Sequence, residues 1–351
     1  MSPLYKKYLF LRSRVAVIVE DMKSDTKISF IKRMKCVSKG FLSSSYYLYD
    51  FKNNDYKDYI SEYQRKKTRF INERDAYVLN NKVIFDNIVK EYIKTPTIYS
   101  LILKGKVYPH IKEPMISNSE SLIDQIKKEG KIVIKPYIDA DSGRGIYICE
   151  YKEGKILFNG IAVEKEDIDF MIEELDKYIV TEYIEQHKYS EGIYPNSVNT
   201  IRILTMEDPH TQEVFIPIAV HRLGTEKTGN VDNWGKGGLS AKVDLDSGIL
   251  SKATSKPVNN KKIWYSTHPD TGAQIEGVKI PNWDSIKDKV LFLAHQMPYI
   301  KYVGWDVLLT KDGEVAIMEA NNCSGVNVLQ SHRPLLKDER AKSFYKYYNI
   351  I

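Results

Sequence analysis

The spacing of apolar residues predicts a helical start to the chain. Residues 1–74 are dense in Lys, Tyr and Ser, and their apolar positions recur at helical intervals. Residues 78–94 repeat an apolar side chain every three or four positions, and Pro96 then favours a helix end just before it. We therefore expect an irregular helical N-terminal region and then an amphipathic helix, with Lys82 near the start of that helix.

After Pro96 the pattern alternates between helix-like and strand-like segments. We expect helices at residues 121–129, 164–175, 284–296 and 338–348. We expect strands at residues 131–135, 145–151, 178–184, 199–206, 214–222, 240–245, 303–310 and 315–320. Because many of these strands follow one another without a helix between them, the order predicts an α+β fold with a largely antiparallel sheet.

Composition narrows the class of protein. The chain has 351 residues, of which 42% are hydrophobic and 28% charged, which is typical of a globular protein of two or three domains. Its net charge of +6 fits a phosphate-rich ligand but is too small for a nucleic-acid-binding surface. Three widely spaced cysteines offer neither a disulfide framework nor a zinc site, so we expect a cytoplasmic protein.

No apolar run reaches the length of a signal-peptide core or of a transmembrane helix. We therefore expect no transmembrane segment. The basic and aromatic residues of the first turns would suit an anionic membrane surface, and a solvated helix face explains them equally well.

Two acidic residues lie in a predicted hairpin near the end of the chain. The sequence VGWDVLLTKDGEVAIMEAN places Asp312-Gly313, a strong turn signal, between two apolar runs. If the turn contains only these two residues, Asp306 and Glu319 face each other, and Asn321 projects from the same face. Opposed carboxylates repel, and Mg²⁺, which binds such oxygen ligands, would relieve that repulsion. A hairpin with a solvated polar face would show the same pattern.

A glycine-containing loop follows the strand expected at residues 131–135. The segment KIVIKPYIDADSGRGIYICE connects Lys135, at the strand end, to Ser142, Gly143 and Gly145. Backbone N–H groups of such a loop can close on phosphate oxygens, and a lysine adds positive charge. The loop has neither a Walker A nor a dinucleotide-binding pattern, and a plain turn between two strands remains the alternative.

Other expected strands carry polar residues that suit a nucleotide site. In YIVTEYIEQH, Glu182, Tyr183 and Ile184 end a strand whose backbone groups can hydrogen-bond a purine edge. Arg202 and Arg222 lie on strands and suit contacts to phosphate or carboxylate groups. An ordinary sheet and structural ion pairs would look the same in the sequence.

Taken in order, these motifs resemble the ATP-grasp superfamily, the fold of D-alanine:D-alanine ligase, glutathione synthetase and biotin carboxylase. The resemblance covers about residues 76–330. More narrowly, segments such as NVDNWGKGGLSAKVDLDSG resemble the sugar-transfer-associated ATP-grasp proteins of bacterial surface-polysaccharide synthesis. The resemblance implies two α+β lobes that clasp ATP, after a mainly helical N-terminal region.

The resemblance also implies a role for individual residues and a division into domains. By role, the expected residues are Lys82, Lys135, Ser142, Gly143 and Gly145 for the phosphates, Glu182, Tyr183, Ile184 and Glu185 for adenine and ribose, Asp306, Glu319 and Asn321 for Mg²⁺, and Lys135, Arg202 and Arg222 for catalysis. The expected domains are a helical region at 1–75, a small lobe with the phosphate loop at 76–183, and a C-terminal lobe with the metal site at 184–351.

The implied activity is that of a Mg²⁺- and ATP-dependent ligase that joins a carboxylate to an amine through an acyl phosphate. Family context favours an amino acid and a sugar acid or amino sugar of a cell-surface polysaccharide as substrates. Two alternatives stay open: a kinase that phosphorylates a sugar hydroxyl, and a non-catalytic ATP-binding module that docks on a glycosyltransferase. Neither the oligomeric state nor the number of metals follows from the sequence.

Overall fold

The computed structural model describes residues 3–111, 115–138 and 145–351, with side chains from residue 8 onward. The chain divides into two compact units. The first, here called the large unit, comprises Met1–Ala76, Tyr189–Val307 and Ala320–Ile351. The second, here called the small unit, comprises Tyr77–Lys188 and Leu308–Glu319.

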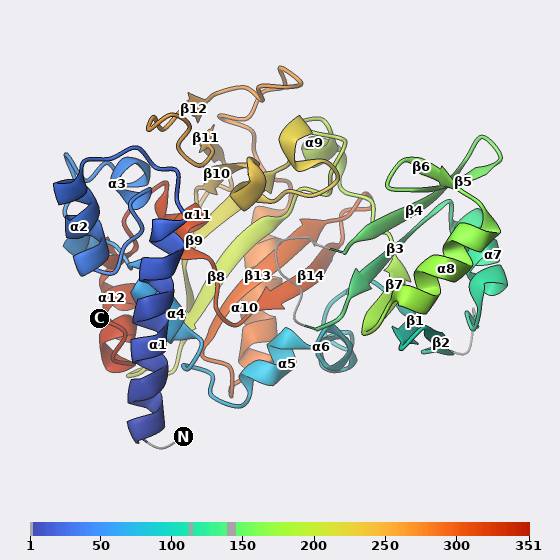
Figure 1. Cartoon of the computed structure of the whole chain (residues 1–351), viewed down its shortest axis with the longest axis horizontal. Coiled ribbons are helices and arrows are strands. Elements are labelled where there is room, and N and C mark those ends of the chain that lie inside the picture. The colour runs from blue at the N-terminus through green and yellow to red at the C-terminus, as the bar shows by residue number, and fades with distance from the viewer. Residues whose placement is uncertain (1–2, 112–114, 139–144) are drawn as a thin grey trace. The chain divides into compact units, whose positions relative to one another are not determined.

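The N-terminal part of the large unit is helical, as the sequence predicts (Figure 1). It contains α1 (Pro3–Met22), α2 (Phe30–Ser38), α3 (Ser45–Leu48), the 3₁₀ turn η1 (Tyr56–Asp58) and α4 (Glu62–Thr68). The described residues before position 76 form no strand. None of the described helices is both long enough and apolar enough to cross a membrane.

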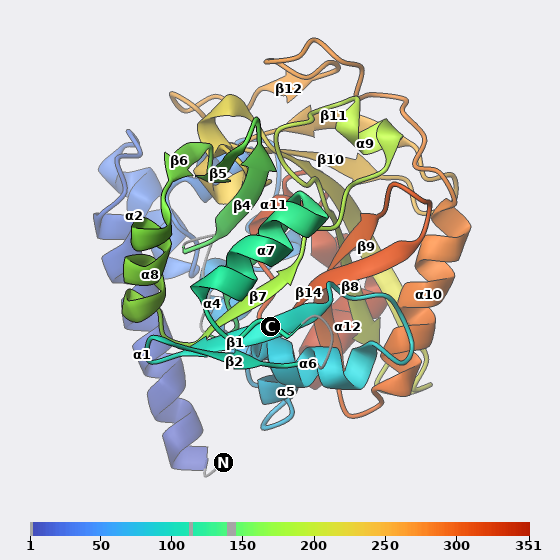
Figure 2. The same ribbon diagram turned by 90° about the vertical axis from the view of Figure 1, so that its right-hand side faces the viewer.

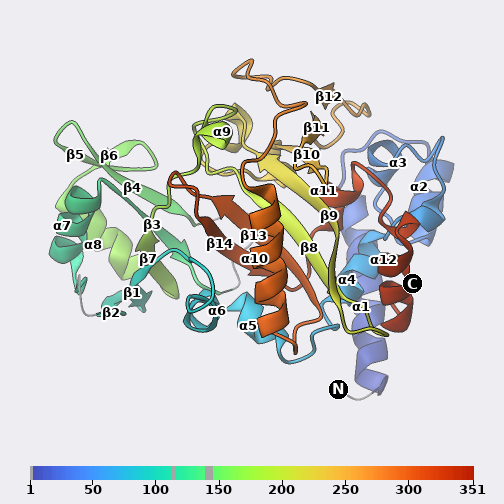
Figure 3. The ribbon, with the colours of Figure 1, turned by 180° about the vertical axis from the view of Figure 1, so that it is seen from behind.

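The remainder of the large unit is built on a seven-stranded sheet, of which residues 308–319, the end of one strand and most of the next, are assigned to the small unit. Its strands are β8 (Ile201–Glu207), β9 (Val214–Leu223), β10 (Leu239–Val243), β11 (Leu250–Thr254), β12 (Trp264–Tyr265), β13 (Tyr302–Leu309) and β14 (Val315–Asn321). Their order is β12-β11-β10-β9-β8-β13-β14, and the neighbours from β12 to β13 are antiparallel. The helix α10 (Trp283–Gln296) packs on β9, as Figure 3 shows.

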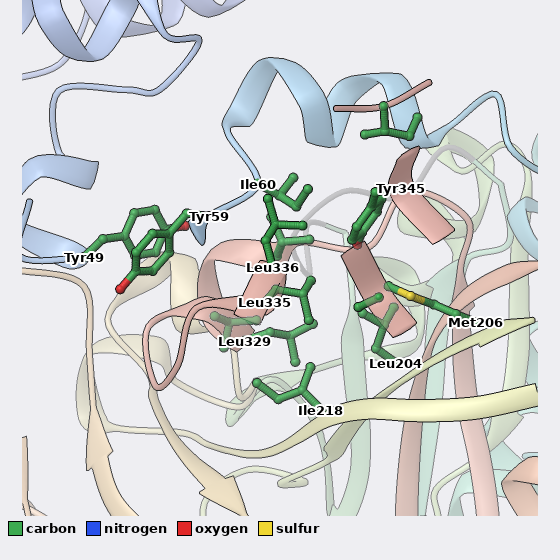
Figure 4. Close-up of a cluster of buried hydrophobic side chains, with 14 of the residues drawn as sticks. Tyr49, Tyr59, Ile60, Leu204, Met206, Ile218, Leu329, Leu335, Leu336 and Tyr345 are labelled. Carbon is green, nitrogen blue, oxygen red and sulfur yellow. The ribbon is translucent and has the colours of Figure 1, made fainter. Parts of the chain in front are cut away.

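One hydrophobic cluster joins the N-terminal helices to this sheet and to the end of the chain (Figure 4). Ile60 lies beside Leu336 there, while Leu204 and Met206 of β8 approach Tyr345. The C-terminal elements of this cluster are α11 (Val326–Gln330), the 3₁₀ turn η4 (Leu335–Lys337) and α12 (Glu339–Tyr347). Because buried apolar area is the main favourable term in folding, this cluster makes the N-terminal helices an integral part of the large unit.

The small unit has its own antiparallel sheet, most of whose strands are labelled in Figure 2. Its strands are β1 (Ile98–Leu103), β2 (Lys106–Pro109), β3 (Lys131–Pro136), β4 (Tyr147–Lys152), β5 (Lys155–Phe158), β6 (Ile161–Val163) and β7 (Tyr178–Glu182), in the order β2-β1-β7-β3-β4-β5-β6. The helices α7 (Ser119–Glu129) and α8 (Lys165–Glu174) cover one face. Ile132 and Ile134 of β3 point into that covered face. Since side chains alternate along a strand, Lys135 belongs to the other face.

The helix predicted over 78–94 is wrong as a single element. It is divided into α5 (Ala76–Asn80) and α6 (Lys82–Val89). The carboxamide oxygen of Asn81 accepts hydrogen bonds from the N–H groups of Val83 and Ile84, and so caps the second helix. Lys82 is therefore the first residue of α6, where its side chain leaves the helix end.

Two strands of the small unit have no counterpart among the predicted elements. They are β1 and β2, and they form a hairpin through Lys104 and Gly105, both of which have positive φ. Lys-Gly is a weaker turn signal than Asn-Gly, because a lysine rarely adopts positive φ. The strands β5, β6, β11 and β12 were also not predicted.

Replacing Ser61 with Ala should lower the free energy of unfolding by about 1 kcal/mol, because it removes the N-cap of α4. Ser61 Oγ accepts the N–H of Gln64, whose side chain in return accepts the N–H of Ser61. Urea unfolding followed by tryptophan fluorescence measures this, since all four tryptophans lie in the large unit. Ser38→Ala, at an exposed serine, is the control, and an equal loss in both variants would contradict the prediction.

Candidate functional site

Two lysines of the small unit lie close together on the sheet face opposite to α7 and α8. Lys82 begins α6, and its N–H donates to Tyr137 O at 2.9 Å, which ties the helix end to the end of β3. Lys135 lies on β3 opposite Ile179 of β7. Both lysines line the same small cavity, together with Thr181.

Two carboxylates accompany these lysines. Lys82 Nζ lies 3.2 Å from Glu319 Oε1. Burial and the positive charge of Lys82 lower the pKa of the Lys135 amine to about 8, although Glu319 and Asp86 act in the opposite direction. We call these four residues the lysine cluster. Two close cations in a partly buried position form a site that an anion would stabilise.

The described part of the candidate phosphate loop is short. Ser142 and Gly143 lie outside the described residues. Gly145, which does lie within them, has a φ of +68°, and a Cβ atom there would collide with the hydroxyl of Tyr178. This position therefore requires a glycine for two reasons, its backbone conformation and the closeness of Tyr178.

The candidate adenine-binding strand is placed at the end of β7. Glu182 accepts hydrogen bonds from the backbone N–H and the hydroxyl of Thr97, at 3.2 and 3.0 Å. Ile184 is buried, and the ring of Tyr183 lies under the Lys131 amine at 4.8 Å. The side chains of Glu182 and Tyr183 thus already have protein partners.

Glu185 has a position apart from these residues. Its carboxylate pairs with Lys311 Nζ at 2.6 Å, and both side chains are more than half exposed. An exposed ion pair of this kind contributes little to stability, so the Glu185 carboxylate remains accessible to a hydroxyl group at little energetic cost.

The large unit gathers the second group of charged residues around Asp306 of β13. Arg202 of β8, its cross-strand neighbour, contacts both carboxylate oxygens of Asp306, at 2.5 and 3.0 Å. Arg222 of β9 reaches the same carboxylate at 3.2 Å, and it also pairs with Asp232 at 3.0 Å. Asn321 of β14 donates to Gly304 O at 3.2 Å. We call Arg202, Arg222, Asp232, Asp306 and Asn321 the arginine cluster.

Opposing effects act on the two carboxylates of the arginine cluster. Burial alone would raise the pKa of Asp306, but Arg202 and Arg222 outweigh it, and the pKa is lowered. Burial raises the pKa of Asp232. The positive charge of Arg222 lowers this pKa, and the negative charge of Asp306 raises it. Asp306 is therefore held ionised at neutral pH, as a metal ligand must be.

Sequence reasoning did not identify Asp232, Thr200 or Asp86. Asp232 accepts the N–H and the hydroxyl of Thr200, at 2.8 and 2.6 Å, and so connects the loop after β9 to the start of β8. Asp86 lies one helical turn after Lys82 and is buried, which is unusual for an aspartate. That spacing on an apolar helix was a usable signal for Asp86. Asp232 carried no comparable signal within its glycine-rich segment.

The hairpin turn differs from the predicted two-residue turn. Thr310 N–H donates to Glu314 O at 2.8 Å, and Gly313 N–H donates to Thr310 O at 2.9 Å. The loop therefore contains three residues, 311–313, with Gly313 at a φ of +82°. The premise of the predicted register is thus wrong at the turn. The facing of Asp306 and Glu319 remains a prediction.

The donor set of the predicted metal site fits Mg²⁺ in its chemistry. Asp306 and Glu319 offer carboxylate oxygens, and Asn321 lies two residues after Glu319 on β14, so it shares the same strand face. No group of three His, Cys, Asp or Glu side chains that would hold a metal occurs among the described residues. Mg²⁺ commonly completes such a set with phosphate oxygens and water.

The sequence matches the protein-family model described as sugar-transfer associated ATP-grasp over residues 62–340. Together with the α+β architecture, this match confirms both the resemblance and the fold class that the motifs predict. No curated protein sequence matches the chain.

The chain is similar to several solved structures, among them two ligases and one synthetase. One is the ATP-grasp ligase PsnB complexed with a minimal precursor, with 12% identity, 74% of this chain and 57% of that chain covered, and a TM-score of 0.39. Another is N5-carboxyaminoimidazole synthetase from Staphylococcus aureus complexed with ADP, with 8% identity, 76% of this chain and 51% of that chain covered, and a TM-score of 0.42. The third is VanG D-Ala:D-Ser ligase from Enterococcus faecalis, with 14% identity, 77% of this chain and 63% of that chain covered, and a TM-score of 0.41. In each case the chain spans less than two-thirds of the other structure.

Proposed function

Because the chain belongs to the sugar-transfer associated ATP-grasp family, we propose that it is a Mg²⁺- and ATP-dependent carboxylate–amine ligase. In the first step a substrate carboxylate oxygen attacks the γ-phosphorus of ATP, and ADP leaves with the electron pair of the broken P–O bond. In the second step an amine attacks the acyl carbon, phosphate leaves, and the amine loses a proton. The products are an amide, ADP and phosphate.

The observation that carries this proposal is that the side chains of Lys82 and Lys135 line one small cavity. Two lysines that repel each other in the free protein gain most from a ligand with several negative charges, and the triphosphate of ATP is such a ligand. Lys82 and Lys135 would bind phosphate oxygens and spread the charge that develops during transfer. Neither lysine needs to form a covalent intermediate.

The arginine cluster and Glu319 contain the residues proposed to bind the metal. Asp306, Glu319 and Asn321 would hold Mg²⁺, which when bound neutralises phosphate charge and stabilises the transition state. Arg202 is almost fully buried and holds both oxygens of Asp306, which suits a positioning role. The Arg222 side chain is 16% exposed, compared with 8% for Arg202, so Arg222 is the better candidate for contact with the transferred phosphoryl group.

Family context supports the finer part of the proposal. The substrates would be an amino acid and a sugar acid or amino sugar of a cell-surface polysaccharide, with Glu182, Tyr183, Ile184 and Glu185 holding adenine and ribose. A glycosyltransferase is the proposed partner, and the cytoplasm is the proposed location. The phosphate-loop role of Ser142, Gly143 and Gly145 belongs to the same proposal.

Hydroxylamine should trap the activated carboxylate as a hydroxamate. The purified protein is incubated with ATP, Mg²⁺ and a panel of sugar acids and amino acids, and hydroxamate, ADP and phosphate are measured. An acyl phosphate is a strong acylating agent and a phosphorylated hydroxyl is not, so hydroxamate with free phosphate indicates a ligase.

Two other outcomes would replace the proposal. A stable phosphorylated product with ADP and no free phosphate would identify a kinase. ATP binding without any turnover across the panel, together with capture of a glycosyltransferase, would identify a binding module. Because a closed site can exclude hydroxylamine, amide formation with the true substrates is measured in parallel.

A further inference from the structure

The large unit contains a cavity of about 690 Å³ that lies outside both charged clusters. It is lined by residues from three distant parts of the chain, the region from α2 to η1, the segment 260–264, and the segment 330–334. This volume is within the range of sites for small organic molecules. Neither the phosphate-binding nor the metal-binding residues of the proposed ligase line it.

The walls of this cavity combine exposed aromatic rings with amide groups. Trp264 is 45% exposed, although large aromatic residues are usually buried. Tyr46 is partly exposed, and the partly exposed side chains of Asn54 and Asn260 also line the cavity. Flat apolar rings beside amides that both donate and accept hydrogen bonds suit a sugar, which has apolar C–H faces and a rim of hydroxyl groups.

Positive charge predominates in the same walls. Lys32, Lys52 and Lys262 line the cavity, against a single lining aspartate, Asp50. Lys32 Nζ lies 4.7 Å from the centre of the Tyr46 ring, and Lys262 Nζ lies 4.4 Å from the Trp264 ring. Burial lowers the pKa of Lys262 to about 8, so its amine is still mostly protonated at pH 7. An anionic group on the ligand would be stabilised by these amines.

One chain of contacts connects the cavity to the arginine cluster within the large unit. His332, in the cavity wall, lies 3.0 Å from Ser240 Oγ. Ser240 of β10 is the direct cross-strand partner of Arg222, so their side chains leave the same sheet face about 5 Å apart. Arg222 in turn contacts Asp306. A ligand in the cavity would therefore lie on the sheet face that carries the arginine cluster.

We propose that this cavity binds the saccharide substrate and that this saccharide carries a carboxylate. The proposal rests on the ligase function proposed above, and it adds the place and the chemical class of one substrate. The aromatic rings would pack on the sugar face, and the lysines would bind this carboxylate, which is therefore not the one that attacks ATP. The contacts of His332 and Ser240 would couple occupancy of the cavity to the position of Arg222.

The test compares two disaccharides that differ only in the carboxylate, cellobiouronate and cellobiose. Calorimetry with the full-length protein should give at least ~10-fold tighter binding of cellobiouronate, because charge-assisted hydrogen bonds contribute more than neutral ones. Lys262→Met should weaken cellobiouronate binding ~10-fold. Lys52→Gln, at an exposed lining lysine, should weaken cellobiouronate binding several-fold without risk to the fold. The control Lys261→Met, at an exposed residue outside the lining, should leave cellobiouronate binding unchanged.

Equal binding of the two disaccharides would overturn the proposal, as would unchanged binding in both lining variants. Tighter binding of UDP than of cellobiouronate would also overturn it, because the cavity would then be a nucleotide site. The ligase function is tested separately by Lys135→Met, which should weaken ATP binding and keep cellobiouronate binding. Bound cellobiouronate with no hydroxamate formed from any carboxylate would reject the ligase and leave the saccharide site intact.

Discussion

Replacing Asp306 with Asn should lower Mg²⁺-dependent ATP turnover at least ~100-fold, because stabilisation of phosphate charge by the metal amounts to several kcal/mol. The change keeps the size of the side chain and removes its negative charge. It thereby weakens both the proposed metal ligand and the pairing with Arg202 and Arg222. Release of phosphate from ATP, measured over a range of Mg²⁺ concentrations, is the readout.

A metal role and a purely structural role of Asp306 give different results. If Asp306 holds Mg²⁺, raising the Mg²⁺ concentration should recover part of the lost activity, and Glu319→Gln should show a similar loss. Asp312→Asn, at an exposed aspartate of the same hairpin, is the matched control and should keep wild-type turnover. Near-normal turnover in both site variants, with unchanged tryptophan fluorescence, would reject the metal assignment.

Replacing Lys135 with Met should weaken ATP binding by about 10- to 100-fold, because hydrogen bonds to charged groups contribute about 1.5–3 kcal/mol each. Methionine fills most of the volume of the lysine stem and removes only the amine. Calorimetric titration with ATP and Mg²⁺ measures the affinity. Lys128→Met, at an exposed lysine of α7, is the control and should bind ATP as the wild type does.

The stability of the Lys135 variant separates binding from folding. In the free protein the Lys135 amine is partly buried and repelled by Lys82, so its removal should leave the melting temperature unchanged or raise it. A variant that is as stable as the wild type and binds ATP weakly supports the phosphate assignment. Wild-type affinity in that variant would show that Lys135 does not contact the phosphates.

Local sequence patterns predicted most of the regular elements of the fold. The strands β3, β7, β8 and β9 lie within a few residues of the expected positions, because alternating apolar residues and nearby turn residues act over short distances. The split at Asn81 was missed, since a polar residue with helical neighbours on both sides disturbs the apolar period only slightly. The strands β1 and β2 were missed because their Lys-Gly turn resembles an ordinary charged loop.

The sequence predicted the candidate site residues that lie in short motifs and missed the partnerships that depend on the path of a loop. Lys82, Lys135, Asp306 and Glu319 stand in short motifs whose spacing is visible in the sequence. The partnership of Arg222 with Asp232 depends instead on how a loop returns to the sheet, which no local pattern records. The saccharide cavity is hidden for the same reason, since its walls come from segments more than 60 residues apart.

The hydrophobic cluster of the large unit also bears on how family members could be recombined. The family match begins at residue 62, yet Phe41, Tyr49 and Ile60 are buried in the same core as Leu329 and Phe344. The boundary recognisable in the sequence is therefore not a boundary of folding. A hybrid enzyme made by exchanging only the matched region would combine two cores that had not been selected together. A successful exchange should carry residues 36–61 along with their own C-terminal helices.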